Sequence, residues 1–96
     1  MKLNFASDPA KAAENLRKHG VSFEEAATVF EGDESAYTDF DVDHSDDDPR
    51  FFTIGISQSG KFLFIVHNEE DDLIRIISAR HATSRERSLY EESESF

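Results

Sequence analysis

The chain has 96 residues, enough for one domain with a modest hydrophobic core and too few for two independent domains. Its 21 acidic residues outnumber 10 Lys and Arg, and the formal net charge of −11 makes most of the surface repel polyanions. The absence of cysteine excludes disulfides and thiolate chemistry, and the longest apolar run, residues 62–66, is too short to span a membrane. We therefore expect a single domain, residues 1–96, in the cytoplasm and without membrane contact.

Two helices are predicted in the first third of the chain. Asp8 is a suitable N-cap, Pro9 fits the first helical position, and Gly20 can adopt the left-handed conformation that ends a helix. Ser22 and Glu25 then form a capping-box pattern that opens the second helix.

The apolar residues of both helices are expected to face one core. In the first helix these are Ala13 and Leu16. In the second helix they follow the i, i+3, i+4, i+7 spacing: Phe23, Ala26, Ala27 and Phe30. The second helix also carries three glutamates and no base, which excludes it as a DNA-reading helix.

The apolar period changes to two near residue 35, which predicts strands. Residues 36–42 alternate as a half-buried edge strand does, and residues 52–56 alternate again. Ser59 and Gly60 supply a short hairpin turn. The apolar run at residues 62–66 then predicts a central strand that is buried on both faces.

The rest of the chain predicts one more strand and one more helix. Residues 68–72 form a polar turn, and residues 73–79 form the last strand. Thr83 and Glu86 make a second capping-box pattern, which opens a C-terminal helix. The predicted fold is therefore α+β, with two N-terminal helices, a four-stranded antiparallel sheet and a C-terminal helix.

The charges are unevenly distributed. Residues 31–48 contain nine acidic residues and no Lys or Arg. Residues 75–90, by contrast, concentrate four of the ten basic residues: Arg75, Arg80, Arg85 and Arg87. A cluster of guanidinium groups suits a phosphate, since each offers a planar fork of donors. The alternative is that these arginines pair with nearby carboxylates.

A metal site is not expected. Residues 41–48 resemble a calcium loop in composition, but Asp46 stands where the turn glycine is needed and Phe52 where the bidentate Glu would lie. No two of the four histidines have i, i+4 spacing, which argues against zinc. No cofactor-binding motif occurs either.

RNA cleavage without a metal needs a base, cations for the phosphorane charge and an acid. His44, Asp48 and Arg50 precede or enter the second strand, while Arg75 and Arg80 lie in and after the last one. If that strand is regular, Arg75 and Arg80 point to opposite faces, and only a bulge or the end of the strand brings them together. From spacing alone, such a nuclease site is a hypothesis.

Several segments closely resemble the BrnT family of bacterial type II toxins. They are NLRKHGVSFEEAATVF (residues 15–30), DHS with a following arginine (residues 43–45 and Arg50), IGIS (residues 54–57) and RIISARHAT…RER…YEE (residues 75–92). The resemblance covers nearly the whole chain. It implies a fold similar to RelE ribonucleases and RNA cleavage that halts translation. It also implies neutralisation by a DNA-binding BrnA-like antitoxin, and it allows a higher-order toxin–antitoxin oligomer.

The resemblance also suggests roles for individual residues. Matches at the N-terminal motif, at the start of the second strand and in the C-terminal motif are Lys11, Asn15, Lys18, His19, Gly20, Arg50, Arg75, Ser78, Arg80, Ala82, Glu86 and Tyr90. We expect Arg50, Arg75 and Arg80 to bind the scissile phosphate, with His44 or Asp48 assisting proton transfer. The family's glutamate before Arg50 is replaced here by Asp48 and Pro49. A catalytically impaired module that binds an antitoxin or a basic partner through its acidic surface is therefore the alternative function.

Overall fold

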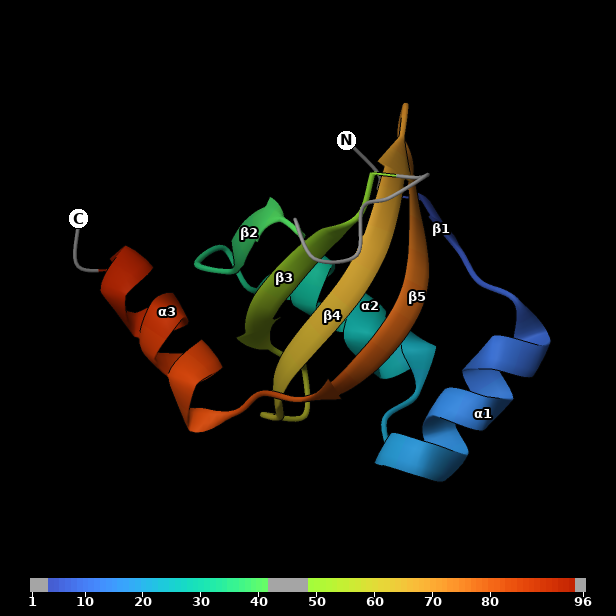
Figure 1. Cartoon of the computed structure of the whole chain (residues 1–96), viewed down its shortest axis with the longest axis horizontal. Helices are drawn as coiled ribbons and strands as arrows, with labels where there is room; N and C mark the ends of the chain where they lie inside the picture. The colour runs from blue at the N-terminus through green and yellow to red at the C-terminus, as the bar shows by residue number, and fades with distance from the viewer. Residues whose placement is uncertain (1–3, 42–48, 95–96) are drawn as a thin grey trace.

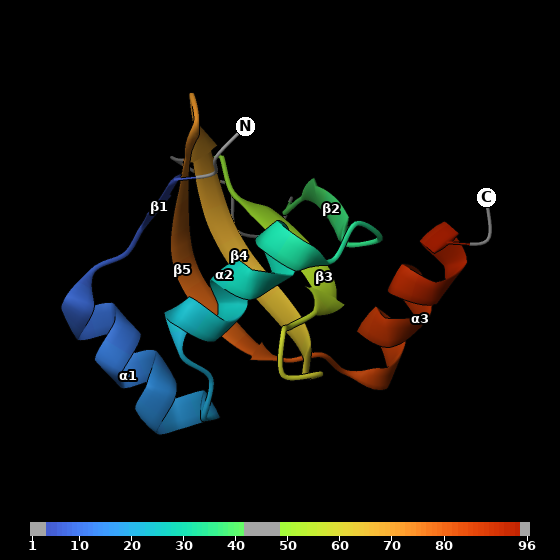
Figure 2. The same cartoon turned by 180° about the vertical axis from the view of Figure 1, so that it is seen from behind.

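In residues 4–41 and 49–94, the part of the chain that the computed structural model describes, five strands form one sheet and three helices pack around it (Figure 1). The elements in chain order are β1 (Asn4–Ala6), α1 (Pro9–His19), α2 (Phe23–Gly32), β2 (Tyr37–Phe40), β3 (Phe51–Ile56), β4 (Phe62–Glu70), β5 (Leu73–His81) and α3 (Ser84–Glu94). The strand order is β1-β5-β4-β3-β2. In Figure 2, α2 crosses one face of the sheet and α1 lies beside β5.

The α+β class is confirmed, but the predicted four-stranded antiparallel sheet is wrong in two respects. The described sheet has a fifth strand, β1, and this strand pairs in parallel with β5. Phe5 lies opposite Ile74 in this pairing. A strand of three residues is too short to show an alternating pattern, so periodicity could not reveal it.

The hairpin between β4 and β5 is longer than predicted. β4 lies at the centre of the sheet, as expected, but it continues to Glu70, so the polar turn is confined to Asp71 and Asp72. Asp71 adopts a positive φ of 55° there. The composition of residues 68–70 favours a loop, whereas the ladder with β5 extends through them.

The helix starts follow the predicted capping residues. Asp8 caps α1, and Gly20, at φ 69°, ends it in the left-handed conformation. Ser22 caps α2 by accepting a hydrogen bond from the N–H of Glu25 at 3.0 Å. The capping box is only half formed, because the Glu25 carboxylate accepts hydrogen bonds from Ser59 instead.

The buried side of α1 differs from the prediction. Ala13 and Leu16 are exposed, and Ala12 and Asn15 face the sheet. The Asn15 amide donates to the carbonyl of Ala79 at 2.8 Å and accepts from the Ala79 N–H at 3.0 Å. A hydrogen-bonded amide, which hydrophobic patterning cannot detect, therefore docks α1 on β5.

The apolar core fills the space between α2, α1 and the sheet. Its buried members are Val21, Phe23, Ala26, Val29, Leu63, Ile65, Ile74, Ile76 and Ala79. The Val29 side chain of α2 packs closely on β3 at Gly55, where an added Cβ would lie 2.5 Å from Val29 Cγ1. This glycine therefore sets how closely α2 can approach the sheet.

His67 is a fully buried polar residue on the same face of the sheet. Its Nε2 is 2.7 Å from Thr53 Oγ1, which is in turn 2.7 Å from Thr38 Oγ1. Phe30 packs edge-on against the imidazole, with ring centroids 5.0 Å apart. Burial lowers the pKa of His67 to about 4, so the ring is neutral at neutral pH.

The third helix packs against the other face, near β3 and β2 (Figure 1). Tyr90 is buried edge-on against Phe62, and its hydroxyl donates to the carboxylate of Asp33 at 3.0 Å. The described residues contain no helix long and apolar enough to cross a membrane.

Candidate functional site

A bulge in β5 settles which side chains share the open face of the sheet. His67 pairs with Ile76 and Val66 pairs with Ser78, so Ile77 is an extra residue in the ladder. An extra residue reverses the alternation of side chains beyond it. Residues on the two sides of Ile77 that would point apart in a regular strand therefore point the same way.

This reversal brings Arg75 and Arg80 to one face, the face opposite α1 and α2. Arg75 lies opposite Asn68 and Arg80 lies opposite Phe64. Asn68 and Phe64 are four residues apart on β4, which corresponds to about 13 Å along the strand. The two arginines thus share a face, but they occupy separate places on it.

A pocket of about 470 Å³ lies on this face. Its lining comes from three strands, from α3 and from the residues after β2 and before β3: Asp41, Arg50, Phe52, Phe64, Val66, Ile77, Ser78, Arg80 and Glu86. The lining therefore combines two arginines with two carboxylates, those of Asp41 and Glu86, over an apolar floor. Arg75 is exposed and is not part of this lining.

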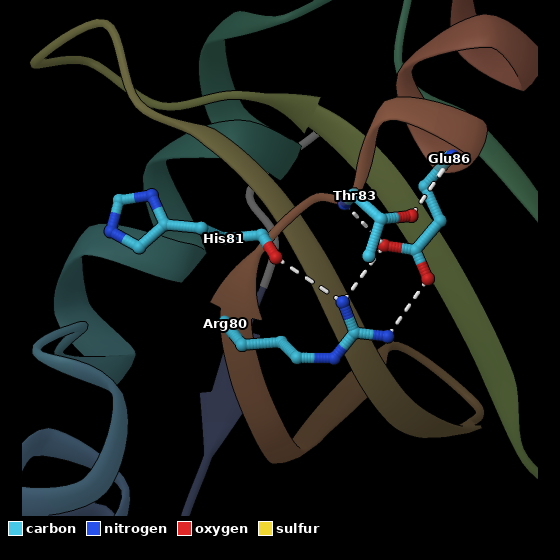
Figure 3. Close-up of polar contacts among 4 residues, drawn as sticks. All are labelled: Arg80, His81, Thr83 and Glu86. Carbon is cyan, nitrogen blue, oxygen red and sulfur yellow. Dashed lines mark hydrogen bonds and ion pairs between the residues drawn. The ribbon is translucent and has the colours of Figure 1, made fainter.

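Arg80 is held in a fixed orientation by its neighbours (Figure 3). Its Nη1 and Nη2 each donate to one oxygen of Glu86 at 2.8 Å, and Nη1 also donates to the carbonyl of His81 at 3.2 Å. The guanidinium carbon lies 4.3 Å from the centroid of the Phe64 ring. This is a bidentate pair combined with a cation–π contact, so both the edge and the face of the guanidinium are fixed.

Glu86 belongs to the capping box that was predicted at the start of α3. Its carboxylate accepts from the N–H of Thr83 at 2.9 Å, and Thr83 Oγ1 accepts from the N–H of Glu86 at 3.2 Å. Burial raises the pKa of Glu86, but the hydrogen bonds from Arg80 and Thr83 outweigh it, and the pKa lies below its usual value. The hydrogen bond to Glu86 in turn raises the pKa of Arg80. Both partners are therefore charged at neutral pH.

Asp41 and Arg50 border the pocket on its second side. Asp41 is only 8% exposed, and its N–H donates to the carbonyl of Arg50 at 2.7 Å. Asp41 belongs to the acidic segment 31–48, whose composition does not predict its burial. The available signal was its alternation with Thr38 and Phe40, which placed it on the same face as Tyr37.

The structure brings two of the predicted site residues together. Arg50 and Arg80 line one pocket, while Arg75 lies further along the same face. His44 and Asp48 lie outside the described residues, and their assignment stays a prediction. Within residues 4–41 and 49–94, no three His, Asp or Glu side chains cluster as metal ligands would.

A second pocket, of about 660 Å³, lies where α2 ends beside β3. Of the described residues, its lining includes the carboxylates of Glu31 and Asp33 and neither Lys nor Arg. A phosphate would be repelled there. The Arg50–Arg80 pocket is therefore the better anion site.

The chain is similar to known toxins in sequence and in fold. A family described as "Ribonuclease toxin, BrnT, of type II toxin-antitoxin system" matches residues 8–86. Among solved structures, the crystal structure of the Brucella abortus ribonuclease toxin, BrnT, matches with a TM-score of 0.64 and 24% identity, over 86% of this chain and 100% of that chain. No curated protein matches. The family match spans Arg50, Arg75, Arg80 and Glu86.

Proposed function

Because the chain belongs to the BrnT family of ribonuclease toxins of type II toxin–antitoxin systems, we propose that it is an endoribonuclease that cleaves RNA without a metal and so inhibits translation. The observation that carries this proposal is the pocket in which Arg50 and Arg80 lie together. A phosphorane transition state gathers negative charge on its oxygens, and oriented guanidinium groups stabilise that charge.

The proposed reaction uses the 2′-hydroxyl of the RNA. A base removes its proton, the 2′-oxygen attacks the adjacent phosphorus, and the 5′-oxygen leaves with a proton from an acid. Arg50 and Arg80 bind the phosphate, and Arg75 contacts a flanking phosphate. We assign the proton transfers to His44 or Asp48, since in the sequence they lie between Asp41 and Arg50. Asp41 and Arg50 both line the pocket.

The partner in this proposal is a BrnA-like antitoxin, because a type II toxin family implies an antitoxin. The antitoxin neutralises the toxin by covering the pocket with a carboxylate or a helix. A higher-order complex and a cytoplasmic location belong to the same proposal. Tight association is expected, since an unneutralised ribonuclease would harm its host.

A catalytically impaired binding module is the second candidate. One observation favours it: Glu86 already neutralises Arg80 in the pocket. In that case the fold would retain antitoxin binding and lose cleavage. The two candidates differ in what happens to RNA when the protein is produced alone.

Induction in cells separates these two functions. The protein is produced alone, with a BrnA-like antitoxin, or as Arg80→Ala, and growth and RNA integrity are followed. Arg17→Ala is the matched control, because Arg17 is an exposed arginine on α1, far from the pocket in sequence and paired with Glu14. The ribonuclease proposal predicts arrested growth and fragmented RNA for the parent and for Arg17→Ala only. Normal growth with intact RNA in the parent would instead favour the binding module.

A further inference from the structure

The guanidinium of Arg80 offers two edges, and Glu86 occupies only one of them. Nη1 and Nη2 each donate one hydrogen to Glu86 along the outer edge of the guanidinium, the edge opposite Nε. The second hydrogen of Nη1 is directed at the His81 carbonyl. The Nε–H and the second Nη2 hydrogen form the other edge. Among the described residues this edge has no hydrogen-bond acceptor, and the dashed contacts of Arg80 in Figure 3 all start from Nη1 or from the outer side of Nη2.

We propose that Glu86 is a positioning residue, which holds Arg80 by its outer edge so that the Nε/Nη2 edge receives the phosphate. This inference rests on the proposed function, because it names how the phosphate is recognised at that same site. A guanidinium can bind one carboxylate and one phosphate at once, since each edge presents two parallel N–H groups. Glu86 thus sets the direction of binding.

The structure supplies three independent restraints on this arrangement. The carboxylate of Glu86 is itself fixed by the backbone N–H of Thr83, in the first turn of α3. The Phe64 ring covers the guanidinium at 4.3 Å, which restricts rotation about the side chain. The bond to the His81 carbonyl fixes a further donor. A pre-oriented donor pair requires little reorganisation when charge develops on the phosphate.

The carboxylate also has an electrostatic effect that distinguishes positioning from attraction. Glu86 is only 16% exposed at its side chain, and it offsets the charge of Arg80. Removing its charge would strengthen the attraction between the pocket and RNA while releasing the orientation of Arg80. Cleavage is therefore expected to fall while RNA binding is kept or strengthened.

Glu86→Gln and Thr83→Ala form a matched pair of variants. Glutamine can still accept the capping hydrogen bond from the Thr83 N–H, but its amide cannot form the two-oxygen pair with Arg80. Thr83→Ala removes the hydroxyl that caps α3 and leaves both the backbone N–H and the Arg80–Glu86 pair. This variant measures what a weakened helix start does by itself.

The experiment measures RNA cleavage together with binding of a 2′-O-methyl RNA, which cannot be cleaved because its nucleophile is blocked. We expect Glu86→Gln to lower kcat on the order of a hundredfold, with 2′-O-methyl RNA bound as tightly as by the parent or more tightly. Thr83→Ala should keep kcat near that of the parent. Parent-like cleavage by Glu86→Gln would overturn the inference, as would an equal loss of kcat in Thr83→Ala.

NMR of the Arg80 Nε–H tests positioning without any cleavage. In the parent this signal should shift when 2′-O-methyl RNA or inorganic phosphate is added, and the shift should be lost in Glu86→Gln. If the folded parent leaves RNA intact, the proposed function fails. The Arg80 Nε–H signal then decides by itself whether Glu86 positions Arg80. An identical shift in the parent and in Glu86→Gln would refute the positioning role.

Discussion

Glu86 accepts hydrogen bonds from Arg80 and from the Thr83 N–H, so one carboxylate ties the end of β5 to the first turn of α3. The capping motif predicted the contact with Thr83 because the two residues are neighbours in sequence. The contact with Arg80 depends on where β5 ends, so the sequence left open whether its arginines pair with carboxylates or bind phosphate. The structure shows Arg80 paired through one edge, and this pairing is compatible with phosphate at the other.

His67 makes the stability of the fold depend on pH. Its pKa is about 4 in the folded protein, against 6.5 for an ordinary histidine. The unfolded chain therefore binds a proton that the folded protein excludes, and stability is lost as pH falls from 6.5 towards 4. Between pH 7 and pH 5 we expect this residue to cost about 2 kcal/mol of unfolding free energy.

Denaturant unfolding at the two pH values measures this loss. Between pH 7 and pH 5, the unfolding free energy of His67→Gln should fall by about 2 kcal/mol less than that of the parent. His81→Gln is the control, because the His81 side chain is exposed, and it should behave as the parent does. Equal losses in all three proteins would exclude His67 as the source.

The bulge in β5 places the two arginines of that strand on one face, but their separation along the strand gives them different roles. Arg80 lines the pocket, and Arg75 lies about 13 Å along the strand from it. Arg75→Ala should weaken RNA binding, with kcat unchanged. The association constant for RNA should also fall less steeply with salt, so that the slope of its logarithm against the logarithm of the salt concentration is about 0.7 smaller in magnitude. Arg80→Ala should instead lower kcat about a hundredfold or more. Equal losses of kcat in both variants would contradict this division.

Gly55 lets α2 approach β3, and a methyl group there should separate them. The added Cβ would meet Val29 Cγ1 at 2.5 Å, so Gly55→Ala should destabilise the protein by about 1–3 kcal/mol. Gly32→Ala, at the end of α2, has no atom within 4 Å of the new Cβ and should stay within about 1 kcal/mol of the parent. Thermal unfolding compares the stabilities of the two variants. Equal stability would show that the structure shifts to accommodate the added methyl group at position 55.

Local chemistry made some elements predictable and left others hidden. The caps at Asp8 and Gly20 located α1 because they act on neighbouring backbone groups. The bulge at Ile77 has no comparable signal, since it depends on the pairing of two strands. Asn15 was matched to a family motif, but its burial against β5 required the tertiary structure. The bulge and the docking of Asn15 therefore escaped prediction, because both depend on contacts between segments that are far apart in the sequence.

At the scale of the whole molecule, a local arginine pocket lies in a protein of net charge −11. The acidic residues 31–48 would attract basic segments of an antitoxin and speed association, an effect that salt weakens. Neutralising Asp46, Asp47 and Asp48 together should slow association at low salt. Glu24→Gln, an exposed change on α2, is the control. An association rate insensitive to salt and to the triple change would mean that the acidic segment serves only solubility.

Metal-independent RNA cleavage is measured on the purified protein in EDTA, with Arg80→Ala and Arg17→Ala beside the parent. We expect the parent and Arg17→Ala to cleave RNA and leave 2′,3′-cyclic phosphate and 5′-hydroxyl ends, because the 2′-oxygen is the nucleophile. Arg80→Ala should be slower by about a hundredfold or more, which corresponds to about 2–4 kcal/mol of transition-state stabilisation. Intact RNA with the parent, or cleavage by Arg80→Ala at the parent's rate, would contradict the proposed mechanism.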